Sequence, residues 1–282
     1  MSTGCLYLCA TPIGNREDIS ARVLRVLEEA DLIAAEDTRH SRGLLQYYGI
    51  DTPLISYHEH NKYERAQELT SRLLKGEKIA LISDAGTPVI SDPGEVLVQK
   101  ARECGIPVTS LPGPCALITA LSLSGIPARR FVFEGFLPQE NKERREVLQS
   151  LKQEGRTIIL YEAPHRLRKT LGELRDALGA DRSLCLCREL TKIHEEALIF
   201  TLEEAIAYYE EREPRGEYVL VLAGKSKEAG EAERKNAWGT QSPEEHLKAY
   251  MGRGLDKKAA MKAMAADFGL SRNEIYKQLL NS

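Results

Sequence analysis

Three short turns rich in glycine and proline follow hydrophobic segments in the first 120 residues. Their sequences are Thr-Pro-Ile-Gly at 11–14, Asp-Ala-Gly-Thr-Pro at 84–88 and Leu-Pro-Gly-Pro at 111–114. Glycine lets a backbone approach a ligand closely, whereas proline stiffens a turn and removes a hydrogen-bond donor. A single turn of this kind is an ordinary strand–helix connection, but three of them favour a ligand-binding edge.

The first 125 residues alternate between predicted strands and helices. Strands are expected at 5–10, 31–35, 53–57, 78–83 and 107–110. Several of them are near-continuous apolar runs, which is typical of parallel strands buried on both faces. Helices are expected after a cap at Asp18, at 61–75 and at 95–103. The alternation predicts an open parallel sheet, in which ligands bind at the carboxyl ends of the strands.

A second α/β block follows a Gly-Ile-Pro break at 125–127. Its strands are expected at 131–134, 157–161, 183–188 and 218–223, with helices at 143–153, 166–178 and 202–210. The wider spacing between these strands predicts a mixed sheet. The fold class is therefore α/β, with one domain at 1–125 and a second at 126–224.

The end of the chain has a different character. Residues 225–240 are polar and charged, which predicts a linker. Residues 241–282 read as short helices around a glycine turn, which predicts a helix-turn-helix-like module. The helix boundaries are expected at Ser242 with Pro243 and Glu245, at Asp256, at Gly269, and at Ser271 with Glu274.

Composition excludes several classes of protein. A length of 282 residues suits about two domains, and the net charge of −3 excludes a basic field over the whole surface. Six cysteines without disulfide spacing, and no signal-peptide pattern, predict a cytoplasmic protein. No stretch has the length of a membrane span.

The turns lack the usual phosphate-binding motifs, since neither G-x-x-x-x-G-K-[ST] nor G-x-G-x-x-G occurs. Carboxylates accompany them instead, at Glu36, Asp37, Asp84 and Asp92. Such a site suits a cationic or ribose-bearing ligand better than a polyphosphate, and S-adenosylmethionine is one ligand of that description.

Other candidate sites have plain structural alternatives. Cys185 and Cys187 share one face of a strand without a second ligand pair, so core cysteines and no metal are expected. Residues 36–39 (Glu-Asp-Thr-Arg) follow a strand and are either a site or a helix cap with a surface ion pair. The same choice applies to 162–166 (Glu-Ala-Pro-His-Arg) and 188–192 (Arg-Glu-Leu-Thr-Lys).

Together these motifs resemble those of the bacterial ribosomal RNA small-subunit methyltransferase I family, of the tetrapyrrole-methylase-like class. Seven motifs occur in order, at 11–15, 36–39, 83–94, 111–114, 134–138, 162–166 and 188–192. The resemblance covers about residues 5–224 and extends into the tail. Local departures are Arg16-Glu17 for Leu-Gly, Val89 for glycine and Cys115 for serine.

The resemblance implies a homodimer of two-domain subunits with S-adenosylmethionine in the cleft between the domains. It further implies 2′-O-methylation of a cytidine ribose in the decoding region of 16S ribosomal RNA. The residues expected to hold the cofactor are Pro12, Gly14, Asp84, Gly86, Thr87, Pro88, Ser91, Gly113, Pro114, Cys115 and Ala116.

The catalytic hypothesis assigns a general base and groups that orient the RNA. Asp37 is the candidate base, because a ribose hydroxyl is weakly acidic, and Arg39 or His165 would orient the ribose or a phosphate. In the tail, Lys257, Lys258, Lys262, Arg272 and Lys277 either contact RNA phosphates or form a solvated helix face.

Two other functions fit parts of the sequence. A tetrapyrrole C-methyltransferase would use the same fold, but the tail and the motifs at 162–166 and 188–192 argue against it. A non-catalytic nucleic-acid-binding regulator would use the tail, which is about one-seventh of the chain and leaves the turns unexplained. Binding of S-adenosylmethionine distinguishes this regulator from an enzyme.

Overall fold

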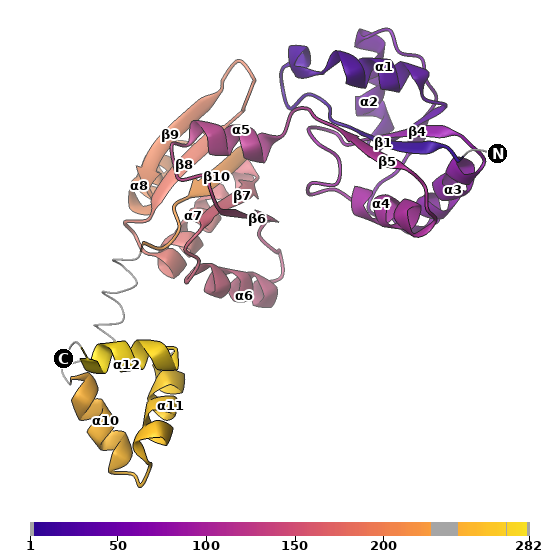
Figure 1. The fold of residues 1–282 in the computed structure, drawn as a ribbon. Helices are drawn as coiled ribbons and strands as arrows, with labels where there is room; N and C mark the ends of the chain where they lie inside the picture. Colours follow the sequence, from indigo (N-terminus) through magenta and orange to yellow (C-terminus); the bar gives the residue numbers. More distant parts are fainter. Residues whose placement is uncertain (1–2, 227–241, 269, 281–282) are drawn as a thin grey trace. The chain divides into compact units, whose positions relative to one another are not determined.

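The computed structural model describes residues 3–226, 242–268 and 270–280 (Figure 1). The chain forms two compact units, residues 1–224 and 225–282. No helix among the described residues is long and apolar enough to cross a membrane.

The first sheet of the larger unit is fully parallel, as the sequence predicts. Its strands are β1 (Cys5–Cys9), β2 (Leu32–Ala35), β3 (Leu54–Ser56), β4 (Lys78–Ile82) and β5 (Val108–Leu111). They are arranged in the order β3-β2-β4-β1-β5. The carboxyl ends of β1, β4 and β5, the three neighbouring strands that precede the three turns, therefore meet at one edge.

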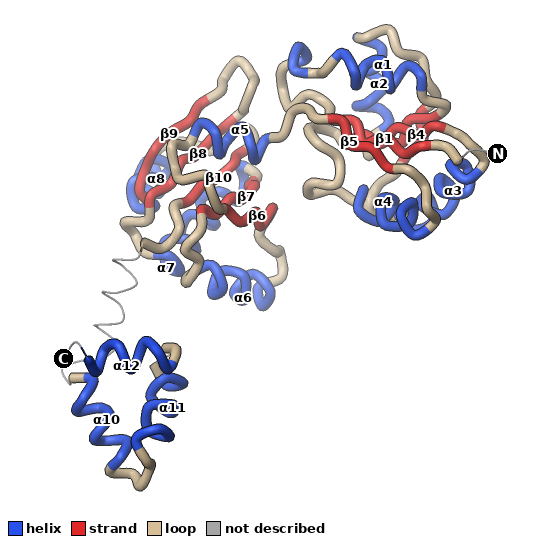
Figure 2. Tube along the Cα trace, in the orientation of Figure 1, coloured by secondary structure: helices blue, strands red, loops and turns tan. Residues whose placement is uncertain are grey.

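Helices cover both faces of this sheet (Figure 2). One face packs against α1 (Ala21–Glu29) and α2 (Thr38–Tyr47), and the other against α3 (Lys62–Leu74) and α4 (Gly94–Glu103). Burial on both faces explains why β2 reads as a continuous apolar run, with all of its residues buried.

The expectation that Asp18 caps the first helix is wrong. Asp18 lies in a short 3₁₀ helix, η1 (Arg16–Asp18), which Asn15 caps by accepting a hydrogen bond from Glu17 N. The cap of α1 is Ser20, whose side chain accepts a hydrogen bond from Val23 N at 3.2 Å. Asp18 belongs to this 3₁₀ turn, which ends before α1 begins at Ala21, so its side chain is not at the capping position.

The second sheet is mixed, as predicted, in the order β6-β7-β10-β8-β9. Strand β6 (Phe131–Phe136) is parallel to β7 (Thr157–Glu162), whereas β10 (Tyr218–Leu222), β8 (Ser183–Arg188) and β9 (Glu196–Thr201) pair antiparallel. Strand β9 was not predicted from the sequence, and its short apolar run at 197–200 lies on a half-buried edge strand.

Helix α5 (Ala116–Leu123) packs on one face of the second sheet, where Cys185 and Cys187 are fully buried core residues, as predicted. The other face packs against α6 (Asn141–Leu151), α7 (Pro164–Leu178) and α8 (Leu202–Glu210). Helix α5 was not predicted because it is apolar almost all round and shows little helical periodicity.

The smaller unit contains α10 (Pro243–Met251), α11 (Lys257–Asp267) and α12 (Arg272–Leu280), packed around their own apolar core. Ser242 and Asp256 cap their helices as predicted, and Ser271 and Glu274 exchange capping hydrogen bonds. Most of the predicted linker at 225–240, and the expected helix stop at Gly269, lie outside the described residues. The helix-turn-helix-like assignment stays a prediction.

Candidate functional site

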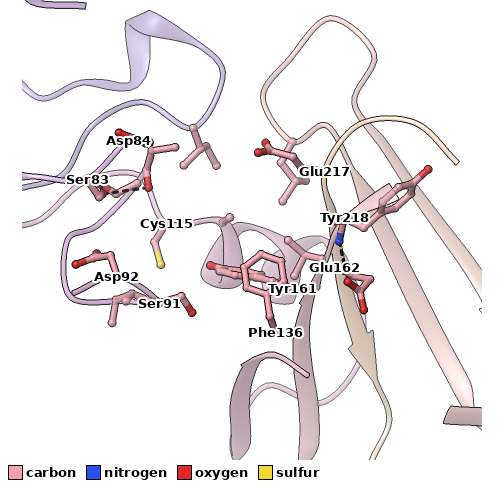
Figure 3. Close-up of a pocket in the computed structure, with 18 of the residues that line it drawn as sticks. Ser83, Asp84, Ser91, Asp92, Cys115, Phe136, Tyr161, Glu162, Glu217 and Tyr218 are labelled. Carbon is pink, nitrogen blue, oxygen red and sulfur yellow. Dashed lines mark hydrogen bonds between the residues drawn. The ribbon is translucent and has the colours of Figure 1, made fainter. Parts of the chain in front are cut away.

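The larger unit contains a cavity of about 540 Å³ lined by residues from both sheets. This volume is in the range of sites for small ligands. The loops that follow strands of the first sheet, together with the start of α5, contribute Glu36, Ser83, Asp84, Gly86, Thr87, Ser91, Asp92, Cys115 and Ala116. The second sheet and its adjoining segments contribute Phe136, Tyr161, Glu162, His165, Glu217 and Tyr218. Figure 3 shows the two groups facing each other across the cavity.

The three turns at the edge of the first sheet are joined by direct contacts. Thr11 and Gly86 exchange backbone hydrogen bonds of 2.9 and 3.0 Å, and Thr87 Oγ1 donates to Pro114 O at 2.9 Å. A Cβ at Gly113 would lie 2.7 Å from the Cβ of Ala10, so a larger residue has no room there. These contacts hold the three turns together as one continuous edge of the first sheet.

The residues expected to hold the cofactor divide into two groups. Asp84, Gly86, Thr87, Ser91, Cys115 and Ala116 line the cavity. Pro12, Gly14, Pro88, Gly113 and Pro114 do not line it and instead shape the turns behind it. Their binding role stays a prediction.

Gly14 joins the first turn to the loop after β8. A Cβ at Gly14 would lie 2.5 Å from Lys192 Cγ and 2.7 Å from Thr191 Oγ1. Beside it, Asn15 N donates a hydrogen bond to Thr191 Oγ1 at 3.0 Å. The motif at 188–192 is thus a brace for the first turn, which the sequence alone could not assign.

The loop between β4 and α4 has an unusual backbone. Val89 and Ser91 have φ angles of 78° and 62°, in the left-handed region that favours glycine. This explains why the resemblance leads one to expect glycine at position 89. Strain of this kind persists where the surrounding structure enforces it, often at functional sites, and Ser91 lines the cavity.

Three carboxyl groups line the first-sheet side of the cavity, at Glu36, Asp84 and Asp92. Burial raises the pKa of Glu36, and the charges of Asp84 and Asp92 raise it further. Burial also raises the pKa of Asp92, whose Oδ2 atom is buried and has no hydrogen-bond partner among the described residues. A cationic ligand would relieve this clustering of negative charge.

Asp37 and Arg39 are not among the lining residues of the cavity. Asp37 caps α2, accepting a hydrogen bond from Arg39 N at 2.8 Å and pairing with Arg39 Nη2 at 3.3 Å. The hydrogen bonds from Arg39 lower the pKa of Asp37, which makes it a weaker base. The helix cap with an ion pair is present, and the catalytic role of both residues stays a prediction.

His165 is exposed and lines the cavity from the start of α7. Beside it, Glu162 is only 1% exposed and lies on the cavity wall. Glu162 accepts hydrogen bonds from Thr170 Oγ1 and Ala163 N, and lies 3.5 Å from Arg166 Nε. The motif at 162–166 therefore has two roles. It contributes residues to the cavity wall, and its buried Glu162 supports the turn that presents His165.

Sequence reasoning missed the aromatic residues of the cavity. Phe136 and Tyr161 pack edge to face with ring centroids 5.7 Å apart, and burial raises the pKa of Tyr161 to about 12. Tyr161 Oη accepts a hydrogen bond from Leu117 N at 3.1 Å, at the first turn of α5. Phe136 ends β6 and Tyr161 is the next-to-last residue of β7, so both lie within strands and not in the turns that were singled out from the sequence.

The chain matches the family Tetrapyrrole (Corrin/Porphyrin) Methylases over residues 5–206. It is 50% identical over 273 residues to the Ribosomal RNA small subunit methyltransferase I of Synechocystis, covering 97% of this chain and 96% of that protein. The chain belongs to the ribosomal RNA small subunit methyltransferase I family, within the tetrapyrrole methylases. It is a methyltransferase.

Another family member, from Pseudomonas aeruginosa, is 47% identical over 99% of this chain and 98% of its own length. Among solved structures, diphthine synthase matches 79% of this chain and 91% of its own with a TM-score of 0.61 and 15% identity. A Thermus thermophilus uroporphyrin-III C-methyltransferase complexed with S-adenosyl homocysteine matches 78% of this chain and 97% of its own, with a TM-score of 0.56 and 19% identity. At these identities the two structures show that the fold is shared.

The first prediction concerns Cys115, which caps α5 with an extended backbone but makes no capping hydrogen bond. In Cys115→Ser a hydroxyl can accept a hydrogen bond from Ile118 N, which should raise the free energy of unfolding by about 1 kcal/mol. Cys115→Ala, which cannot accept this bond, is the matched control. Equal stability of the two variants in denaturant unfolding would contradict the prediction.

Proposed function

We propose that this methyltransferase transfers the methyl group of S-adenosylmethionine to the 2′-oxygen of a cytidine ribose in the decoding region of 16S ribosomal RNA. The observation that carries the proposal is the near full-length similarity to proteins named for methylation of small-subunit ribosomal RNA. The substrate is the RNA of the small ribosomal subunit, and the place of action is the cytoplasm.

The cavity fits S-adenosylmethionine, which combines a positively charged sulfonium, a ribose and an adenine. The unpartnered Asp92 Oδ2 and the neighbouring carboxyl groups of Glu36 and Asp84 compensate a positive charge. The turn at Gly86 and Thr87 brings backbone close to the ligand, and Phe136 and Tyr161 add apolar surface. When bound, the cofactor supplies an activated methyl group.

The protein's task is then to align the ribose hydroxyl and to accept its proton. Asp37 is the proposed base from the sequence, with Arg39 or His165 orienting the ribose or a phosphate. Glu36 is a second candidate base, because it lines the cavity and makes no hydrogen bond or ion pair within the described structure.

The pH dependence of methyl transfer distinguishes these two carboxyl groups. A base must be ionised, so the rate falls as the pH drops through its pKa. The pKa of Asp37 is lowered by Arg39, and that of Glu36 is raised by burial. If Asp37 is the base, kcat should fall only at pH values below the ordinary pKa of an aspartate. If Glu36 is the base, kcat should already fall at pH values above the ordinary pKa of a glutamate.

Substituting each of the two carboxyl groups provides a second test of which one is the base. The variant of the true base, Asp37→Asn or Glu36→Gln, should lose about 100-fold in kcat. The variant of the other residue is its control, and binding of S-adenosylmethionine by calorimetry is measured for both. A rate unchanged in Asp37→Asn would remove Asp37 from the role of base.

The helical tail is proposed to add RNA affinity through Lys257, Lys258, Lys262, Arg272 and Lys277. The larger unit contains both sheets and their cores, so a chain ending at Gly224 should still bind S-adenosylmethionine. We expect it to bind small subunits about tenfold more weakly, because several phosphate contacts are lost. Unchanged affinity in a filter-binding assay would show that the tail is a solvated module.

A homodimer is proposed for the assembled enzyme. The edge strand β9 and the preceding loop expose large apolar side chains, with Ile199 72% and Ile193 93% exposed. Ile199 lies opposite Cys185 on the face that carries α5, where Ile118 is also exposed. A second copy of the chain covering this face would bury them.

The test of the proposed function is methyl transfer to small ribosomal subunits that lack the modification, with the product nucleotide mapped by mass spectrometry. We expect one methyl group on a cytidine 2′-oxygen in the decoding region. Methylation of a porphyrinogen instead would identify a tetrapyrrole methyltransferase, and failure to bind S-adenosylmethionine would favour a non-catalytic regulator.

A further inference from the structure

Helix α2 exposes a basic surface. Residues 38–47 contain two arginines and a histidine but no aspartate or glutamate. Arg39, His40 and Arg42 are all exposed, with the Arg39 side chain 92% accessible. The buried residues Ser41 and Leu45 mark the opposite side of the helix. These basic side chains therefore share the solvent face.

A further arginine joins this face from the turn after β1. The Arg16 guanidinium lies 4.2 Å from the ring centroid of Tyr47, which is 59% exposed. Tyr48 Oη donates a hydrogen bond to Arg16 O, which fixes this part of the chain against α2. We call Arg16, Arg39, His40, Arg42 and Tyr47 the α2 basic face.

The charges of this face are only partly neutralised. Asp37 pairs with Arg39, whereas neither Arg16 nor Arg42 has an ion pair among the described residues. The carboxylates of Glu17 and Asp18 follow Arg16 in η1 and make no ion pair with it. At least two free guanidinium groups are thus available to an anionic partner.

Gly43 lies at the centre of the face. A Cβ built there has nothing within 4 Å, so packing does not require glycine. Glycine inside a helix costs about 1 kcal/mol relative to alanine. Glycine leaves the helix backbone without a side chain between Arg39 and Arg42 on one side and Tyr47 on the other. A nucleic-acid backbone can therefore approach the helix closely at this position.

The position of the face connects it to the cavity. Helix α2 begins at Thr38, two residues after Glu36, which lines the cavity. Arg16 lies three residues after Ile13, another lining residue. A strand of RNA whose target nucleotide enters the cavity would therefore pass beside both segments.

We propose that the α2 basic face binds the sugar–phosphate backbone next to the target nucleotide, with Gly43 allowing its close approach. The inference rests on the proposed function, since it names where the RNA substrate lies. Arginine and an exposed tyrosine are the residue types that bind phosphates and unstacked bases of single-stranded RNA.

The test compares two double variants with the same change of charge. Arg16→Glu/Arg42→Glu alters the face, whereas Lys75→Glu/Arg102→Glu alters exposed residues at the end of α3 and on α4, on the other side of the first sheet. Binding to unmodified small subunits is measured by filter binding at several salt concentrations, and S-adenosylmethionine binding by calorimetry.

The face variant should bind subunits about tenfold more weakly or worse, and the slope of log affinity against log salt should become shallower by about one to two. Its affinity for S-adenosylmethionine should match that of the unchanged protein, because neither residue lines the cavity. The Lys75/Arg102 variant should keep most of its subunit affinity and the original slope.

A second substitution separates RNA contact from folding. Gly43→Gln should raise the thermal stability, because glutamine favours a helix, and yet weaken subunit binding by obstructing the backbone. Equal subunit affinities for the two double variants, or an unweakened Gly43→Gln, would overturn the inference while leaving the proposed function intact. If the unchanged protein neither binds nor methylates subunits, the proposed function fails and the inference with it.

Discussion

The pair of hydrogen bonds between Thr11 and Gly86 holds together the edge of the first sheet on which the site is built. It joins the turn after β1 to the turn after β4, and the Thr87 hydroxyl joins the latter to Pro114 after β5. Each bond contributes only about 1 kcal/mol, but together they fix three strand ends relative to one another. The close approach of the turns also requires a residue as small as glycine at position 113, where a Cβ would lie 2.7 Å from the Cβ of Ala10.

The opposite wall of the cavity depends on a different kind of support. Tyr161 accepts a hydrogen bond from the start of α5, and Glu162 is held by Thr170 and Arg166. The Thr191 hydroxyl and the Lys192 side chain contact the first turn across the sequence. A ligand in the cavity thus meets surfaces that are held in place before it binds, which lowers the cost of ordering them.

Charge divides the surroundings of the site into two regions. Carboxyl groups with raised pKa values line the first-sheet side of the cavity, which suits a sulfonium. Arg42 on α2 and Arg16 in η1 make no ion pair among the described residues, which suits a polyanion. An acidic pocket beside a basic face is compatible with both the net charge of −3 and the proposed RNA substrate.

The sequence by itself determined the parallel first sheet, the mixed second sheet and the capped tail helices, because their apolar periods and capping residues are local patterns. It also identified the family, through motifs in a fixed order. Tertiary structure decided what those motifs do: Gly14 and the 188–192 motif brace each other, and Tyr161 and Phe136 complete the cavity. It also placed Glu36, and not Asp37, on the cavity wall. Which of two neighbouring side chains faces a cavity depends on backbone angles and on contacts between residues far apart in the sequence, and the spacing of residues along the chain contains neither.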